Sequence, residues 1–146
     1  MAIDSTIAIK RGMVALAKGN SPLIALVPTK DIYGQTVKAE HGWPFIRSGS
    51  PSAVPVRATC VDGGEWTVAM HVFAKDRMSG AKAVETAEDY AGRIGALLAA
   101  ALDGQALTLP SGRARVLWTG SQLLMDPDEP GCFHSIQNFR VRAITG

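Results

Sequence analysis

The C-terminal part of the chain holds two strand-like runs joined by a turn, and this pair constrains the fold more than any other feature. The runs are residues 113–119 and 133–143, and the turn, 126–131, is rich in acidic residues and proline. Along the second run apolar and polar side chains alternate, as in a strand with one buried face. The apolar set is Phe139, Val141 and Ala143, and the polar set is Asn138, Arg140 and Arg142. A dozen extended residues span roughly 40 Å, whereas a domain of this length has a radius of gyration of about 15 Å, so the hairpin crosses the whole molecule.

Length and composition predict one globular domain, residues 1–146. Hydrophobic residues make up 47% of the chain and charged residues 19%, which is ordinary for a folded protein. A chain of this size buries close to 70% of its unfolded surface and needs no metal or disulfide to hold it. The net charge of +2 is too small to indicate nucleic-acid binding by itself. We expect Cys60 and Cys132 to be reduced thiols, with a disulfide between them as the alternative.

Neither a signal peptide nor a membrane span is expected. Residues 1–5 lack the basic region and apolar core of a signal peptide. The longest mostly apolar stretch, residues 94–102, is far shorter than the roughly 20 residues that span a bilayer. We therefore expect a protein that is made in the cytoplasm and has no membrane partner.

Two main helices are predicted from periodic apolar stripes. The first follows Asp4 or Ser5, both good N-cap residues, and ends near Gly19. The second is predicted to start with Ser79 as its N-cap and to end near residue 103. Its apolar stripe consists of Val84, Ala87, Ala91, Ile94, Leu98 and Ala101. Its small residues would let the first helix approach closely, and they are Gly92, Gly95, Ala96, Ala99 and Ala100.

The clearest strand is residues 65–75, which carries apolar side chains on both faces and is therefore expected near the centre of a sheet. Shorter strands are predicted at 32–33, 43–47 and 106–109. Residues 49–64 are rich in Ser, Pro and Gly, so we predict a long loop there. This order predicts an α+β fold: an antiparallel or mixed β-sheet with the two main helices on one face and a long C-terminal β-hairpin.

The sequence shows no pattern of catalytic or metal-binding residues. The three histidines, His41, His71 and His134, lie far apart in the chain and lack metal-ligand spacing such as HExxH. The motifs GxSxG, GxGxxG and GxxxxGK[ST] are absent. We therefore expect no enzymatic activity, no cofactor and no metal site. His71 is expected to be partly buried and to have a hydrogen-bond partner.

Charged residues of the predicted hairpin are the candidate contact residues. The basic ones are Arg113, Arg115, Arg140 and Arg142, and the acidic ones are Asp126, Asp128 and Glu129. If the two strands pair, the arginines gather on one surface. That surface is either a solvated face that guards against aggregation or a contact for an acidic partner or nucleic acid. The acidic residues lack the EF-hand pattern and form a turn first of all.

The layout resembles the tail-completion, or tail-terminator, family of long-tailed bacteriophages, prophages and gene transfer agents. The likeness covers about residues 10–143 and rests on the order of the pieces rather than on one motif. The pieces are a first helix, the segments 23–27, 32–33 and 43–46, the strand 66–73, the Ala-rich helix to Leu102, the acidic turn and the segment 134–141. The family has no catalytic residues to transfer to this chain.

The resemblance implies a structural subunit that forms a homo-hexameric ring. The ring would cap the head-proximal end of the tail tube, end tube growth and offer a docking face to the head connector. Its partners would be copies of itself, the tail tube protein and a head-completion or connector protein, with DNA passing through the lumen without specific binding. It would assemble in the host cytoplasm and remain at the neck end of the virion tail. The alternatives are another head–tail joining component and a small nucleic-acid-binding module.

Overall fold

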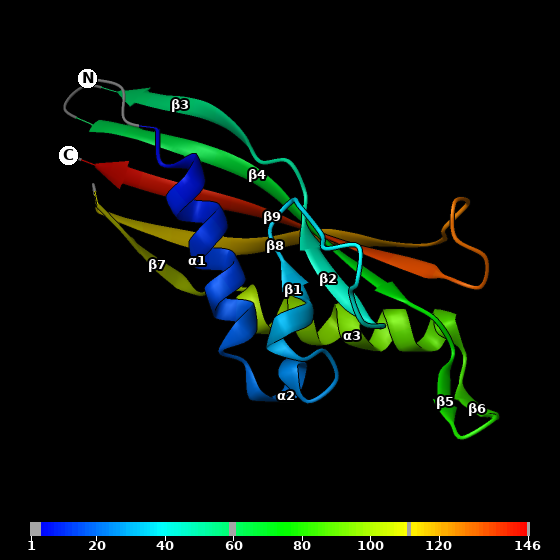
Figure 1. The fold of residues 1–146 in the computed structure, drawn as a ribbon. Helices are drawn as coiled ribbons and strands as arrows, with labels where there is room; N and C mark the ends of the chain where they lie inside the picture. The colour runs from blue at the N-terminus through cyan, green and yellow to red at the C-terminus, as the bar shows by residue number, and fades with distance from the viewer. Residues whose placement is uncertain (1–3, 59–60, 111, 146) are drawn as a thin grey trace.

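The computed structural model describes residues 4–58, 61–110 and 112–145, and it has the predicted α+β architecture (Figure 1). Its helices are α1 (Thr6–Lys18), α2 (Ser21–Ile24) and α3 (Ala87–Leu102), with a 3-10 turn η1 (Thr29–Asp31). Its strands are β1 (Ile32–Tyr33), β2 (Phe45–Ser48), β3 (Ser52–Ala58), β4 (Val61–Ala74), β5 (Arg77–Ser79), β6 (Lys82–Glu85), β7 (Ala106–Leu109), β8 (Gly112–Met125) and β9 (Phe133–Thr145). Within the described ranges no helix is both long enough and apolar enough to cross a membrane.

One mixed sheet organises the molecule. Its strand order is β1-β2-β4-β9-β8-β7, and β3 also pairs with β4. β1 and β2 run parallel, and the other neighbouring strands run antiparallel. β4 is long enough to pair with β3 along its first half and with β2 along its second half. The hairpin β5–β6 is a separate two-stranded sheet that projects from the body at the start of α3 (Figure 1).

The core lies between the helices and one face of the sheet, which we call the inner face. Strand β4 sends every second side chain into it: Trp66, Val68, Met70, Val72 and Ala74. Ile9 and Met13 of α1 and Ile94 and Leu98 of α3 join the same cluster and have no exposed surface. Burial of each large apolar side chain contributes about 1.5–3 kcal/mol. Since both helices pack into one cluster, the predicted placement of the two main helices on one face is confirmed.

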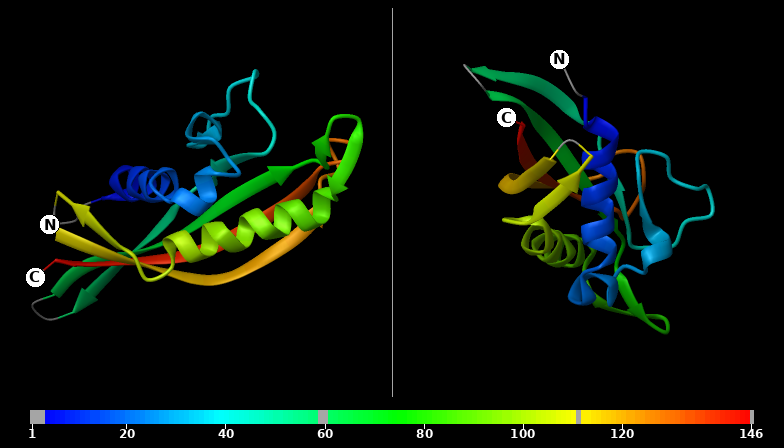
Figure 2. Two further views of the ribbon diagram at one scale, coloured as in Figure 1. Left: turned by 90° about the horizontal axis from the view of Figure 1, so that it is seen from below. Right: turned by 90° about the vertical axis from the view of Figure 1, so that its left-hand side faces the viewer.

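Strands β8 and β9 form the predicted long C-terminal hairpin, which we call the ribbon. Its register runs from Arg113 opposite Ile144 to Met125 opposite Phe133, with the turn 126–131 beyond. The apolar positions of β9 are buried and its arginines are exposed, as the alternation predicts. The ribbon runs across the molecule (Figure 1), and α3 lies along it (Figure 2).

The prediction of a loop at residues 49–64 is wrong, because β3 occupies much of this segment and β4 already begins at Val61. The glycines and prolines that suggested a loop have other roles. Pro55 lies in an edge strand, where a missing backbone N–H is tolerated. The indole of Trp66 lies over Gly64, where a Cβ would come within 2.5 Å of ring atom Cη2. Gly64 therefore makes room for a core side chain instead of making a turn.

The predicted start of the main helix at Ser79 is also wrong, because residues 77–85 form the projecting hairpin. Gly80 has φ +63°, a left-handed conformation that favours glycine, and it turns β5 into β6. The N-cap of α3 is Thr86, whose side chain accepts a hydrogen bond from the backbone N of Asp89 at 3.2 Å. Val84 is therefore not on the helical stripe but on the hairpin, with 44% of its surface exposed.

The glycines of α3 pack against strands and not against α1, contrary to the prediction. A Cβ at Gly95 would lie 2.7 Å from Nε2 of Gln137 and 3.2 Å from Cβ of Ser135, both on β9. A Cβ at Gly92 would lie 3.6 Å from Cδ2 of Leu123 on β8. Gly95 thus allows α3 to sit directly on the ribbon.

Candidate interaction surfaces

The four ribbon arginines are exposed on the outer face of the sheet, the face away from α1 and α3. Arg115 lies directly opposite Arg142 on the neighbouring strand, and Arg113 and Arg140 flank this pair. Glu65 of β4 lies opposite Arg142 on its other side. Like charges directly opposite each other destabilise a sheet. An acidic partner at this end of the sheet would relieve that repulsion.

The acidic turn lies at the other end of the ribbon. The carboxylate of Asp126 accepts a hydrogen bond from the backbone N of Asp128 at 3.0 Å, which shapes the turn. Glu129 forms an ion pair with Nζ of Lys75 at 2.7 Å, which ties the turn to the end of β4. The structure therefore separates the predicted contact residues into a basic group and an acidic group. The length of the ribbon lies between them.

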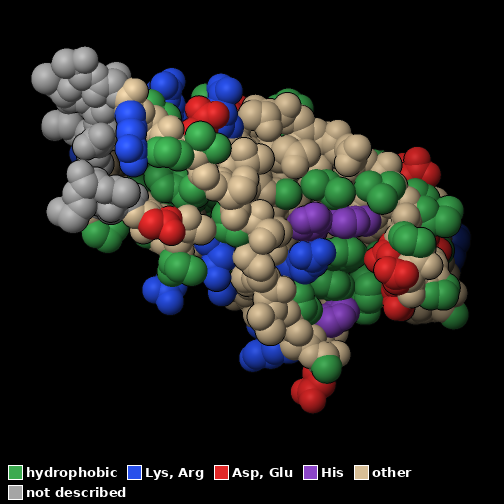
Figure 3. All heavy atoms as spheres, turned by 90° about the horizontal axis from the view of Figure 1, so that it is seen from above, with side chains coloured by type: hydrophobic (Ala, Val, Ile, Leu, Met, Phe, Trp, Pro, Cys, Tyr) green, Lys and Arg blue, Asp and Glu red, His purple; other side chains and the backbone are tan. Residues whose placement is uncertain are grey.

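A histidine–aromatic cluster that the sequence analysis missed lies on the outer face, towards the acidic turn. The pairing of β4 with β9 brings Nδ1 of His71 within 2.7 Å of Nε2 of His134. Phe73 stacks on Phe45 and on His134, with ring centroids 4.8 Å and 4.2 Å apart, and His41 lies 4.0 Å from Phe45. Histidine side chains are visible on this face, two of them adjacent and a third apart from them (Figure 3). Only the pairing register reveals the cluster, since its members are far apart in the sequence.

Burial and the nearby Arg47 keep His71 and His134 neutral. The guanidinium of Arg47 lies 5.4 Å from the centre of the Phe73 ring. Burial, Arg47 and His134 together lower the pKa of His71 to about 4. Burial and Arg47 also lower the pKa of His134. Near neutral pH both rings are therefore uncharged, and one ring nitrogen donates the shared hydrogen bond to the other. The expectation of a partly buried, hydrogen-bonded His71 is confirmed.

Metal ligands do not gather at this cluster. In the part of the chain that the structure describes, no three His, Cys, Asp or Glu side chains are placed to hold a metal ion. Cys132 is a free, buried thiol packed against Phe45 and Phe73, and burial raises its pKa to about 11. Cys60 lies outside the described residues. What the structure shows here is packing and hydrogen bonding.

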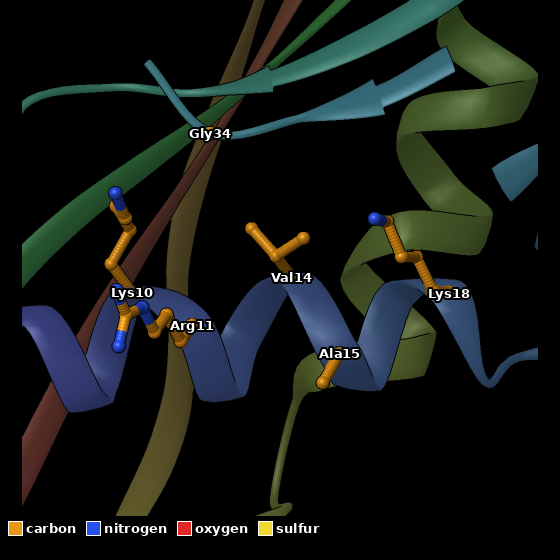
Figure 4. Close-up of a pocket in the computed structure, with 6 residues that line it drawn as sticks. All are labelled: Lys10, Arg11, Val14, Ala15, Lys18 and Gly34. Atoms are coloured by element: carbon orange, nitrogen blue, oxygen red, sulfur yellow. The ribbon is translucent and has the colours of Figure 1, made fainter. Parts of the chain in front are cut away.

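A shallow pocket of about 290 Å³ lies along the solvent side of α1 (Figure 4). Its lining residues are Lys10, Arg11, Val14, Ala15, Lys18 and Gly34. Lys10 and Lys18 extend from α1 on either side of Val14 (Figure 4). No ion pair involving these cations forms among the described residues. The helical side of the molecule thus carries a second basic surface.

A small α+β subunit with an open outer sheet face, free sheet edges and segregated charges belongs to the class of proteins that work by contacting other chains. The comparison with protein families places it within that class. The model of the family described as Tail completion protein gp17 matches residues 11–144, and the chain belongs to this family. It is therefore a structural component of a phage-type virion tail.

One solved structure has the same fold along its whole length. It is a chain from the structure titled "Virion of native gene transfer agent (GTA) particle", with a TM-score of 0.78 and 16% sequence identity. The match covers 99% of this chain and 100% of that chain. A search of curated proteins finds no match. At this identity the structural likeness establishes the fold.

Proposed function

We propose that the chain is a tail terminator that forms a homo-hexameric ring on the head-proximal end of the tail tube. The observation that carries the proposal is family membership over residues 11–144 in a fold whose long ribbon has opposite charges at its two ends. A ring is built from heterologous contacts, in which two different surfaces of the same chain meet. One such surface is the end of the ribbon that carries the four arginines, which we call the arginine end. The other is the acidic turn at the opposite end.

In this role the protein ends tube growth and offers a docking face to the head connector. Its partners are neighbouring copies, the tail tube protein and a head-completion or connector protein. DNA passes through the lumen without specific binding, and the protein acts by assembly and not by catalysis. It assembles in the host cytoplasm and remains at the neck of the finished tail.

The test is to remove the protein from assembling particles and to measure tail length by electron microscopy. A terminator is expected to leave overlong tails, because tube growth is no longer stopped. Full heads that lack tails, beside tails of normal length, would refute termination and support the second candidate, a head–tail joining component. Native mass spectrometry with tail tubes present is expected to show a hexamer, and a chain that stays monomeric on tubes would refute the ring.

The arginine end can be tested as a contact between copies. Arg142→Glu is expected to weaken self-association about tenfold, because it places an acid opposite the acidic turn of the neighbour. Asp128→Arg in the same chain is expected to restore part of the loss, since the two charges are then exchanged. Lys30→Glu changes an exposed cation elsewhere and serves as the control.

The nucleic-acid-binding alternative makes a different prediction for the same surface. It requires salt-dependent DNA binding that is lost when Arg140 and Arg142 are both replaced by alanine. We expect no such binding from the isolated chain. Tight binding that disappears in the double variant would favour the alternative.

A further inference from the structure

The strand β8 has a free edge along residues 119–125, which we call the β8 edge. β7 pairs only with the first part of β8, from Gly112 to Arg115. The loop before β7 covers the next residues: the backbone N of Val116 donates to the carbonyl of Gln105 at 2.8 Å, and the backbone N of Trp118 to Oδ1 of Asp103 at 2.9 Å. Beyond this point no strand among the described residues pairs with this side of β8.

Apart from a β-bulge between Trp118 and Gly120, the β8 edge lacks the features that normally protect a free edge. Proteins guard such edges with charges, proline or short strands. The segment 119–125, Thr-Gly-Ser-Gln-Leu-Leu-Met, contains neither a charge nor a proline. Three of its apolar side chains are exposed: Leu123 by 45%, Leu124 by 38% and Met125 by 66%. An edge with this composition is suited to accept another strand.

On the opposite side of the same sheet β3 forms a second edge of equal length, and in the described part of the chain it pairs with no strand other than β4. β3 pairs antiparallel with β4, β4 with β9, and β9 with β8. β3 and β8 therefore run in opposite directions on the two sides of the sheet. A second copy placed alongside in the same orientation would present its β3 antiparallel to the β8 edge, which is a heterologous contact.

We propose that the β8 edge pairs with β3 of the neighbouring copy, so that one sheet continues from subunit to subunit. The proposal rests on the ring proposed above and identifies the contact that builds it. β3 is uncharged from Ser52 to Val56 and carries one charge, Arg57, near its end; Val54 is 63% exposed. Pro55 removes one donor from the β3 edge, so one rung of the ladder is not made.

Charge complementarity supports this occupant. β3 lies beside the end of β4 that pairs with the arginine end of β9, whereas the β8 edge leads into the acidic turn. Figure 1 shows β3 and the turn 126–131 at opposite ends of the molecule. Pairing of the two edges places the acidic turn of one copy towards the end of the neighbour's sheet that carries the arginines, with β3 and β4 between them.

The pairing also predicts how the copies are displaced. Within one chain, the residues of β3 can be followed across the sheet through their partners on β4 and then on β9. They align in this way with residues 113–117 of β8. To reach the β8 edge, the next copy must shift along the strands by about eight residues, roughly 26 Å. A constant shift at every contact is a shear, which tilts the strands relative to the axis of a closed ring.

Pairs of introduced cysteines test whether the two edges pair and which side chains then share a face of the sheet. Val54 is on the outer face of β3, and Gln122 and Leu124 are on the outer face of β8, whereas Leu123 is on the inner face. With Cys60 replaced by serine, oxidation of Val54→Cys with Gln122→Cys or with Leu124→Cys should link copies into a ladder of covalent oligomers. Val54→Cys with Leu123→Cys is the matched control, because its thiols lie on opposite faces of the continued sheet.

The experiment uses purified particles as well as the isolated full-length chain. Assembled rings that give no ladder with either outer-face pair, or an equal ladder with the Leu123 pair, would overturn the pairing. As a second measurement, Leu124→Lys should lower self-association at least tenfold while the circular dichroism spectrum stays unchanged, and unchanged association would refute the proposal. Tail length after removal of the protein tests the terminator role separately, so either idea can fail while the other stands.

Discussion

Replacing Gly95 with alanine should loosen the contact between α3 and the ribbon. The new methyl group would meet Oγ of Ser135 and would lie 2.7 Å from Nε2 of Gln137. Neither side chain is free to move away, because Nε2 of Gln137 donates to Oγ of Ser135 at 3.0 Å and Nε1 of Trp118 donates to Oε1 of Gln137 at 2.9 Å. Either α3 must shift outward or this buried network must break.

The size of the effect follows from two opposing terms. Overpacking of a well-filled site costs about 1–3 kcal/mol, and a network that is fixed by hydrogen bonds favours the upper end. Alanine also stabilises a helix interior by about 1 kcal/mol relative to glycine. The net loss at Gly95 is therefore about 2 kcal/mol. At Gly92 the nearest atom is Cδ2 of Leu123 at an ordinary 3.6 Å, so only the helix term remains and alanine should stabilise by up to about 1 kcal/mol.

The two variants form a matched pair on one helix, and the difference of about 3 kcal/mol between them is the quantity to measure. Urea unfolding of both variants and the parent gives it, at one fixed protein concentration, because self-association adds to apparent stability. A Gly95→Ala variant as stable as the parent would refute the reasoning. So would a Gly92→Ala variant that loses as much stability as Gly95→Ala.

Three further predictions concern the N-terminus of α3 and the histidine cluster. Thr86→Ala should cost about 1 kcal/mol in urea unfolding, because the N-cap hydrogen bond is lost, and no loss would contradict the cap. Hydrogen bonds from Arg93 and Arg77 lower the pKa of Glu85 to about 2, so its contribution to holding the hairpin is present above pH 4.5 and is lost as pH falls towards 2. Its carboxyl resonance should titrate near 2, and in Arg93→Ala closer to 4.5. The folded pKa of His71, about 4, lies below the unfolded value of 6.5, so stability should fall as pH drops from 6.5 to 4. The loss should be smaller in His71→Gln. Urea unfolding midpoints of both proteins at pH 7 and pH 5 measure the difference.

The parts of the fold that the sequence predicts well are those with long, regular periodicity. The ribbon, the centre of β4 and α1 each repeat one pattern over many residues, and the structure contains all of them. The sequence places the N-terminus of α3 too early, because Ser79 resembles an N-cap and the apolar stripe can be extended back to Val84. Only the turn at Gly80 and the ion pairs of Glu85 with Arg77 and Arg93 distinguish a hairpin from a first helical turn.

Local composition also misled where packing decided the outcome. Gly64 looks like a loop residue until Trp66 is seen to cover it, and that contact depends on the tertiary structure of the strand. The histidine cluster was invisible for a related reason. His71 and His134 meet only because β4 pairs with β9 in one register, and a shift by one residue would turn one of the two side chains to the other face.

The distribution of burial explains why folding and assembly can be separated experimentally in this chain. The main core is confined to the inner face, while the arginine end of the outer face and the β8 edge remain exposed. Gly95 belongs to the first region, so its substitution should change the free energy of unfolding. Leu124 belongs to the second, where a lysine side chain can remain in water in the free subunit but loses the apolar cross-strand contact with β3 of the neighbour. Because the core on the inner face stabilises the fold and the exposed arginine end and β8 edge contact neighbours, a variant can lose self-association and keep its fold.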